Sequence, residues 1–208
     1  MKGRRSYHHR GGEAPLLGVT IPEHFAAVAR AHGDRAAVIG VPQGRRLSYA
    51  ELAGATDELA RGLLAAGFGP GDRVGVWSTN NIEWLLLQMA TARIGAVLVN
   101  INPAYRPKEL AYALEKSEVQ GLFTIPAFRG SDYVGMLREL IPALDEPVQG
   151  ALSCDAYPAL RRVVVYDPAA PSETRRPAPG FGTWQEVIAA GREIPAERLA
   201  EVSARLDP

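Results

Sequence analysis

Three glycines in the segment Gly67-Phe-Gly69-Pro-Gly71 are the residues of this chain that most suggest phosphate chemistry. A dinucleotide-binding loop needs a strand before its glycines and a helix after them, so that the helix N–H groups face the phosphates. Here a helical pattern runs into the glycines and a strand pattern follows them, so the negative end of the helix would meet them. We therefore interpret the segment as a helix end followed by a turn. The sequence contains neither a G-x-x-x-x-G-K-[ST] loop nor a G-x-S-x-G elbow.

Four asparagines flank the ends of two predicted strands: Asn80, Asn81, Asn100 and Asn102. In an open parallel sheet, ligands bind beyond the carboxyl ends of the strands, and this places the four carboxamides at a candidate binding site. Helix capping and turn formation are the alternative interpretation, and asparagine is favoured in both roles. The alternative needs fewer assumptions, so no ligand-binding role is assigned to the four residues.

The four histidines do not form a metal-ligand pattern. His24 and His32 fall on one predicted helix, eight residues apart and without a third ligand nearby. His8 and His9 are adjacent, but no cysteine or carboxylate is spaced to join them. We interpret all four as solvent-exposed side chains.

The remaining reactive side chains also have structural interpretations. Glu51 and Glu58 share a predicted helix, but Glu51 fits a capping position and Glu58 a solvated face, which makes them poor candidates for an acid/base pair. Cys154 is the only cysteine, so an intramolecular disulfide is excluded, and no histidine or lysine close in sequence would activate its thiol. The residues by themselves therefore assign no catalytic, cofactor-binding or metal-binding position.

Composition limits the possible partners. The chain has 208 residues with 23 Lys+Arg and 23 Asp+Glu, so its formal net charge is zero and nothing favours nucleic acid as a partner. The basic N-terminus lacks the apolar run of a secretory signal, and the longest apolar block, residues 84–92, is too short to span a bilayer. We expect a soluble protein in a reducing, cytoplasmic setting, with no transmembrane segment.

Capping boxes and apolar periodicity predict the elements that must position these residues. Thr20-Ile-Pro-Glu23, Ser48-Tyr-Ala-Glu51 and Thr183-Trp-Gln-Glu186 each predict a helix start. The first helix would run to about His32 and bury Phe25, Val28 and Ala29. Residues 36–41 and 45–47 are predicted to form a hairpin around Pro42-Gln-Gly44.

The central region alternates helical and strand patterns. Strands are predicted at 73–77, 96–100 and 119–125, with helices at 81–93 and 109–116 between them. A helix in every crossover requires parallel pairing. The helix at 81–93 is apolar on nearly every side and is expected to be buried all round. The strand at 96–100 lacks polar alternation and is expected to be covered on both faces.

The signal weakens after residue 125. We predict a helix at 132–144, a strand at 162–166, a loop at 167–182 and an amphipathic helix at 195–206. The fold class is α/β, with a parallel-rich sheet flanked by helices. Residues 1–19 are predicted to be a flexible N-terminal arm, and residues 20–208 the folded part.

Six segments of this chain, in the same order along the sequence, resemble segments of the acyl-adenylate-forming enzymes, in the fatty-acyl-CoA ligase branch. The pair ATARIGA (90–96) and NINPAY (100–105) is the most specific to that branch. The segments are APLLGVTI (14–21), LSYAEL (47–52), GDRVGVW (71–77), NIEWLLLQMATARIGAVLVNINPAY (81–105), FRGSDYVGML (128–137) and LRRVVVYD (160–167). The resemblance implies that residues 20–208 are the N-terminal part of an AMP-dependent synthetase/ligase domain.

The resemblance implies a chemistry and also its incompleteness. Members of this family activate a fatty acid with ATP and Mg²⁺ and transfer the acyl group to coenzyme A. They do so with a Ser/Thr/Gly-rich phosphate loop ending in Pro-Lys, a downstream Glu near the metal, an Asp for the ribose and a C-terminal lysine. No position of this chain matches any of these, and it ends at RLDP (205–208), where family members continue into the phosphate loop. The isolated chain is therefore expected to be catalytically incomplete.

Two other interpretations remain open at the level of sequence. The chain would be a non-catalytic interaction domain that complements a separately encoded ligase portion, or an α/β domain that binds a small ligand. An adjacent reading frame that begins with the phosphate loop would favour the first.

Overall fold

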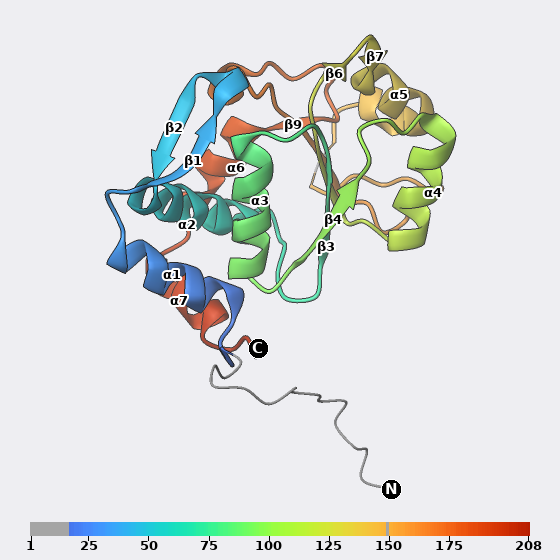
Figure 1. Ribbon diagram of the computed structural model, residues 1–208. Helices are drawn as coiled ribbons and strands as arrows, with labels where there is room; N and C mark the ends of the chain where they lie inside the picture. The colour runs from blue at the N-terminus through green and yellow to red at the C-terminus, as the bar shows by residue number, and fades with distance from the viewer. Residues whose placement is uncertain (1–16, 149) are drawn as a thin grey trace, which may run out of the picture.

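The computed structural model describes residues 17–148 and 150–208, which form two small hairpins and a five-stranded sheet flanked by helices (Figure 1). All five strands of the main sheet run parallel, in the order β4-β3-β5-β8-β9. Their bounds are β3 Arg73–Trp77, β4 Val97–Ile101, β5 Gly121–Thr124, β8 Arg162–Val165 and β9 Gly182–Thr183. The predicted α/β fold with a parallel sheet is confirmed.

Helices cover both faces of the sheet. Figure 1 shows α2, α3 and α6 on one side and α4 and α5 on the other. The helices are α1 Ile21–Ala31, α2 Tyr49–Ala65, α3 Ile82–Arg93, α4 Pro107–Ser117, α5 Tyr133–Leu140, α6 Trp184–Gly191 and α7 Ala196–Ser203. The hydrophobic core lies between these layers and includes the fully buried Trp77, Phe123 and Val164. Gln88 is the only exposed residue of α3, as expected for a helix buried all round.

The antiparallel hairpin of β1 (Ala36–Gly40) and β2 (Arg45–Ser48) is confirmed, with a short 3-10 turn at Val41–Gln43 between its strands. On α1, Ala29 is buried, whereas Phe25 and Val28 are half-buried. Of the predicted arm, residues 17–19 are exposed and belong to no helix or strand, and residues 1–16 lie outside the described part of the chain.

The expectation that the strand at 96–100 is covered on both faces was wrong. β4 is the edge strand of the sheet, and Val97 at its start is 51% exposed. A β-branched run is typical of a buried parallel strand, but burial also depends on which strands are neighbours in space. Within residues 17–148 and 150–208, no strand pairs with the outer edge of β4.

The region after residue 125 was predicted less well. A short hairpin of β6 (Ala127–Phe128) and β7 (Ser131–Asp132) was missed. The predicted helix at 132–144 ends at Leu140, and a 3-10 turn, Pro142–Asp145, follows it. The predicted loop at 167–182 also contains a 3-10 turn at Pro171–Glu173 and ends in β9, which pairs with β8. The strand at β8 and the helices at α6 and α7 are confirmed.

All three predicted capping boxes are present. In the second, the Ser48 N–H donates to Glu51 Oε2 at 2.8 Å and the Glu51 N–H donates to Ser48 Oγ at 3.2 Å. The hydrogen bond from the backbone N–H of Ser48 lowers the pKa of Glu51 below its ordinary value of 4.5, and the equivalent bond from Thr20 lowers the pKa of Glu23. The ionised carboxylates therefore stabilise the starts of α2 and α1.

This predicts a dependence of stability on pH. Because the folded-state pKa of Glu51 is lowered, its contribution is present above the unfolded-state pKa and is lost as the pH falls through the folded-state pKa. We expect the unfolding temperature to fall between about pH 5 and pH 3. Glu51→Gln should make that fall less steep, because glutamine still caps the helix but does not titrate. Thermal unfolding followed by circular dichroism measures both curves, and identical slopes would contradict the assignment.

Candidate functional site

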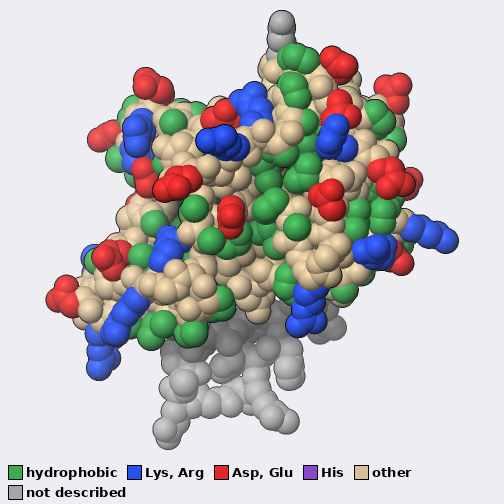
Figure 2. Space-filling model, turned by 90° about the horizontal axis from the view of Figure 1, so that it is seen from above, with side chains coloured by type: hydrophobic (Ala, Val, Ile, Leu, Met, Phe, Trp, Pro, Cys, Tyr) green, Lys and Arg blue, Asp and Glu red, His purple; other side chains and the backbone are tan. Residues whose placement is uncertain are grey.

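A cleft of about 780 Å³ lies where the carboxyl ends of β3 and β4 meet. The structure brings together all four asparagines that flank the strand ends, and Figure 2 looks down onto this end of the molecule. The lining residues are Pro42, Gln43, Ser78, Thr79, Asn80, Asn81, Trp84, Asn100, Ile101, Asn102, Pro103, Phe128 and Pro168. The cleft is thus formed by the end of β4, the start of α3, the loops after β3, β4 and β8, the hairpin turn and β6. It is where an open parallel sheet is expected to bind a ligand.

Two of the four asparagines have the structural roles that the sequence suggested. The side-chain oxygen of Asn81 accepts from the Trp84 N–H at 2.8 Å and caps α3, while its nitrogen donates to Ser78 Oγ at 2.8 Å. The Asn102 side chain accepts from the Ala104 N–H at 2.9 Å and closes a turn. These two carboxamides are therefore largely used by the protein itself.

The other two asparagines remain available to a ligand. Asn80 and Asn100 are exposed, and neither side chain hydrogen-bonds to another described residue. Each carboxamide offers two donors and an acceptor to the cleft. Trp84 and Phe128 add half-buried aromatic rings to its walls.

Gln43 fixes one wall of the cleft, a role that the sequence did not indicate. Its nitrogen donates to Glu83 Oε2 and to the Pro168 carbonyl, both at 2.8 Å, and its oxygen accepts from the Ile82 N–H at 2.8 Å. One side chain thus joins the hairpin turn to the first turn of α3 and to the loop after β8. Gln43 is 39 residues from Ile82 and 125 from Pro168, so only the folded chain brings them together.

A stacked aromatic pair holds the loop that brings Asn102 and Pro103 to the cleft. The rings of Trp77 and Tyr133 lie 3.7 Å apart between centroids and are inclined by 5°. Trp77 Nε1 donates to the Asn102 carbonyl at 3.1 Å, and the Tyr133 hydroxyl donates to the Pro103 carbonyl. Burial raises the pKa of Tyr133, so the hydroxyl keeps the proton that it donates. The pair fixes two consecutive carbonyls of the loop that carries Asn102.

Removing one of these bonds should loosen the loop without collapsing the core. We expect Tyr133→Phe to lower the free energy of unfolding by about 1 kcal/mol, because the Pro103 carbonyl loses its donor while the ring stack remains. Hydrogen exchange of the Ala104 and Tyr105 amides should become faster, while exchange in β3 stays unchanged. Unchanged exchange at both amides would show that the hydroxyl does not hold the loop.

Buried Tyr166 contacts Asn81, one of the residues that line the cleft. Its hydroxyl donates to Asn81 Oδ1 at 3.4 Å, and burial raises its pKa well above the ordinary range for tyrosine. The neutral phenol therefore acts as a hydrogen-bond donor and is not a candidate base.

The other residues considered from the sequence do not join the cleft. Gly67 has φ +86° and its N–H bonds to Leu64 at the end of α2, which confirms the helix-end interpretation. His24 and His32 are exposed, and Cys154 lies half-buried in a loop.

Glu51 caps α2 and Glu58 is half-buried on the same helix. His8 and His9 lie outside the described residues.

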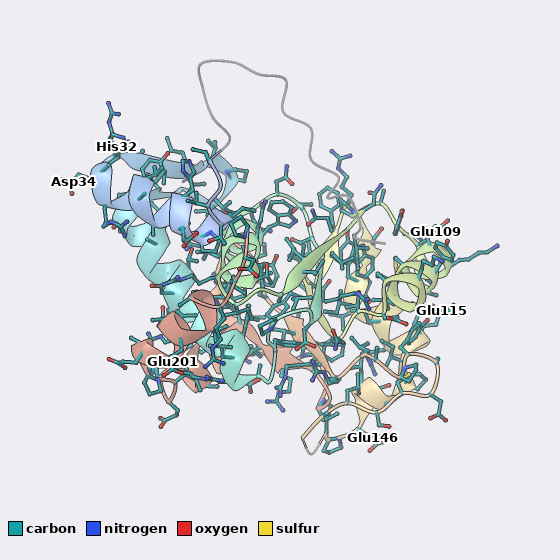
Figure 3. All side chains as sticks on the ribbon, turned by 90° about the horizontal axis from the view of Figure 1, so that it is seen from below. His32, Asp34, Glu109, Glu115, Glu146 and Glu201 are labelled. Atoms are coloured by element: carbon teal, nitrogen blue, oxygen red, sulfur yellow. The ribbon has the colours of Figure 1, made fainter. Side chains whose placement is uncertain are left out.

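The described residues offer no cluster of acidic side chains and histidines that could hold a metal ion. Figure 3 shows the labelled His32, Glu109, Glu146 and Glu201 at distant points of the periphery. No group of three His, Cys, Asp or Glu residues able to hold a metal ion occurs within residues 17–148 and 150–208. The cleft itself is lined by no charged residue. Its lining therefore suits uncharged, hydrogen-bonding groups and offers no cation to a triphosphate.

The sequence matches the family described as AMP-binding enzyme over residues 25–200. It is 34% identical over 189 residues to the mitochondrial medium-chain acyl-CoA ligase ACSF2 of Mus musculus, covering 91% of this chain and 29% of that protein. It is 38% identical over 151 residues to the putative acyl-CoA synthetase YngI of Bacillus subtilis, covering 73% and 28%. The chain thus spans less than a third of the length of these relatives.

Solved structures agree with the fold. The apo structure of Mycobacterium smegmatis MbtA matches with a TM-score of 0.63 and 28% identity, covering 86% of this chain and 28% of that one. The N-terminal domain of FACL13 from Mycobacterium tuberculosis matches with a TM-score of 0.59 over 86% and 37%, and at 17% identity it supports the fold alone. None of the helices in residues 17–148 and 150–208 combines the length and apolar character needed to cross a membrane. The family match extends over most of the 208 residues of this chain. The chain therefore belongs to the AMP-binding enzyme family and corresponds to an N-terminal part of such enzymes.

Proposed function

We propose that this chain supplies the N-terminal scaffold of an ATP-dependent fatty-acyl-CoA ligase and does not catalyse acyl-adenylate formation by itself. The observation that carries the proposal is the similarity to acyl-CoA ligases over 91% of this chain but only 29% of the relative. In the complete reaction, a fatty acid and ATP give an acyl-adenylate and pyrophosphate, and the acyl group then passes to coenzyme A.

The chemistry of the cleft supports the inactivity of the isolated chain. Attack of a carboxylate on the α-phosphate needs cationic groups or a metal ion to neutralise the charge that develops. The lining of the cleft contains no lysine, arginine, aspartate or glutamate, and the sequence has no Ser/Thr/Gly-rich loop ending in Pro-Lys. ATP, Mg²⁺ and coenzyme A are therefore ligands of the complete ligase, to which this chain contributes uncharged walls.

Isotope exchange between ATP and pyrophosphate tests the proposal. The purified chain is incubated with ATP, Mg²⁺ and a medium-chain fatty acid, chosen because the relative ACSF2 is named a medium-chain acyl-CoA ligase. A complete acyl-CoA ligase assayed in parallel is the positive control. We expect exchange no greater than in a sample without fatty acid, because the phosphate-handling groups are absent. Exchange that depends on the fatty acid would overturn the proposal.

A second candidate function is supported by the available carboxamides of Asn80 and Asn100. Under this alternative the chain is a small-ligand-binding α/β domain. A thermal-shift screen against nucleotides and acyl-CoAs distinguishes the two, since only the second function predicts a saturable rise in unfolding temperature with the isolated chain.

The partner follows from the first proposal, whereas the setting is proposed from the single cysteine. We propose that the remaining ligase portion completes the active site, whether it is encoded on the same polypeptide or separately. We also propose a cytoplasmic setting, which fluorescence microscopy of a tagged chain in its own host would test.

A further inference from the structure

The outer edge of β4 has unpaired backbone groups. The Val97 N–H donates to the Asp72 carbonyl at 2.8 Å on the β3 side. Alternate residues of a parallel strand bond to the same neighbour, so Val99 and Ile101 also face β3, and the N–H and C=O groups of Leu98 and Asn100 point outward. No other described strand pairs with this edge, and α3 and α4 lie to either side of it in Figure 1.

β4 lacks the features that normally prevent an edge strand from pairing. Such strands are commonly very short, or carry a lysine, a proline or a bulge. β4 reads VLVNI, with no charge and no proline, and its register with β3 is continuous over five residues. The opposite edge of the sheet is protected in this way, because β9 has only two residues. Of the two edges of the sheet, β4 is therefore the one that can accept another strand.

We propose that β4 pairs antiparallel with β4 of a second copy of this chain, across a two-fold axis at Val99. In this register Leu98 of each copy lies opposite Asn100 of the other, and four backbone hydrogen bonds form. The proposal is independent of the proposed ligase function, since it concerns how the isolated chain associates.

The side chains are complementary in the same register. Val97, Val99 and Ile101 share one face of the strand, so Val97 meets the partner's Ile101 and Val99 meets the partner's Val99. Apolar and β-branched cross-strand pairs of this kind stabilise antiparallel sheets. Val97, which is 51% exposed in the single chain, would be partly buried against the partner strand. No charges are placed opposite each other, and the chain's formal net charge of zero adds no overall repulsion. The edge strand itself carries no charged residue, so an uncharged strand such as a second β4 fits it better than a charged partner.

Leu98→Pro is the test variant, because it removes a donor that the sheet of one copy does not use. Proline is accepted on an edge strand when its missing N–H would face solvent. The variant eliminates two of the four hydrogen bonds of the dimer and puts a ring in their place. Sedimentation velocity over about 1 µM to 1 mM should give a monomer–dimer equilibrium for the wild type, and the variant should raise the dissociation constant about tenfold or more.

Leu98→Val is the matched control, since it keeps the backbone donor, and it should dimerise like the wild type. Circular dichroism establishes that both variants are folded. If Leu98→Pro does not fold, Val97→Lys replaces it, because a lysine at an edge opposes pairing without removing a sheet bond. A wild type that remains monomeric throughout the range overturns the proposal. A dimer that persists in the folded edge variant also overturns it, because another surface then holds the copies together.

Discussion

Replacing Gly62 by alanine is expected to lower the free energy of unfolding by about 2 to 3 kcal/mol, near the upper end for overpacked cores. Gly62 is buried where α2 crosses α6, and a Cβ there would lie 2.5 Å from the Val187 carbonyl oxygen. Gly191 mirrors it, since its Cβ would lie 2.5 Å from the Gly62 nitrogen. The atoms on both sides of the contact belong to the backbone, so no side-chain rotation can relieve the clash. The two helices must therefore move apart to accommodate the added methyl group.

Gly54→Ala is the matched control, on the same helix. Gly54 is exposed in α2, and no atom lies within 4 Å of a Cβ built there. Alanine should therefore stabilise the helix by about 0.5 to 1 kcal/mol, through its higher helix propensity. Urea unfolding followed by circular dichroism measures both variants. Equal stabilities for Gly62→Ala and Gly54→Ala would show that the helix crossing is looser than described.

Glu83→Ala is the second substitution with a large expected effect, a loss of about 2 to 3 kcal/mol. The Glu83 side chain is 1% exposed and accepts from the Arg45 guanidinium and, at 2.8 Å, from the Gln43 amide. Removing the carboxylate leaves the Arg45 guanidinium and one N–H of the Gln43 amide without this partner, beside a cavity. The expected loss of stability is smaller than for a fully buried pair, because the Arg45 side chain is 36% exposed and can turn toward water.

The effect of Glu83→Ala should also be local. Gln43 loses one of its three anchors, so the hairpin wall of the cleft should loosen and the Ile82 amide should exchange faster with solvent. Glu118→Gln serves as a control, because the Arg73–Glu118 pair has side chains 43% and 67% exposed and should change stability by about 0.5 kcal/mol or less. If the two variants unfolded at the same urea concentration, the buried network would not stabilise the hairpin wall.

The cleft shows how far sequence reasoning reached. Asn80, Asn81, Asn100 and Asn102 were placed together from the rule that parallel strands end at one edge of a sheet, and the structure does bring them together. Capping of α3 by Asn80 or Asn81 was also visible from the sequence, and the structure assigns it to Asn81, which accepts from an N–H three residues away. Gln43, Trp77 and Tyr133 were missed as positioning residues, since their partners are distant in sequence.

Local interactions explain why the sequence by itself determined the helix starts, the alternation of helices and strands and their parallel pairing. A capping box closes within four residues, and apolar periodicity extends over one element, so both are written in consecutive residues. Strand order, the exposed edge of β4, the pairing of β9 and the close approach of Gly62 to Gly191 were decided only by the tertiary structure. Each of these depends on which distant segments become neighbours, and that follows from packing the whole chain around one core.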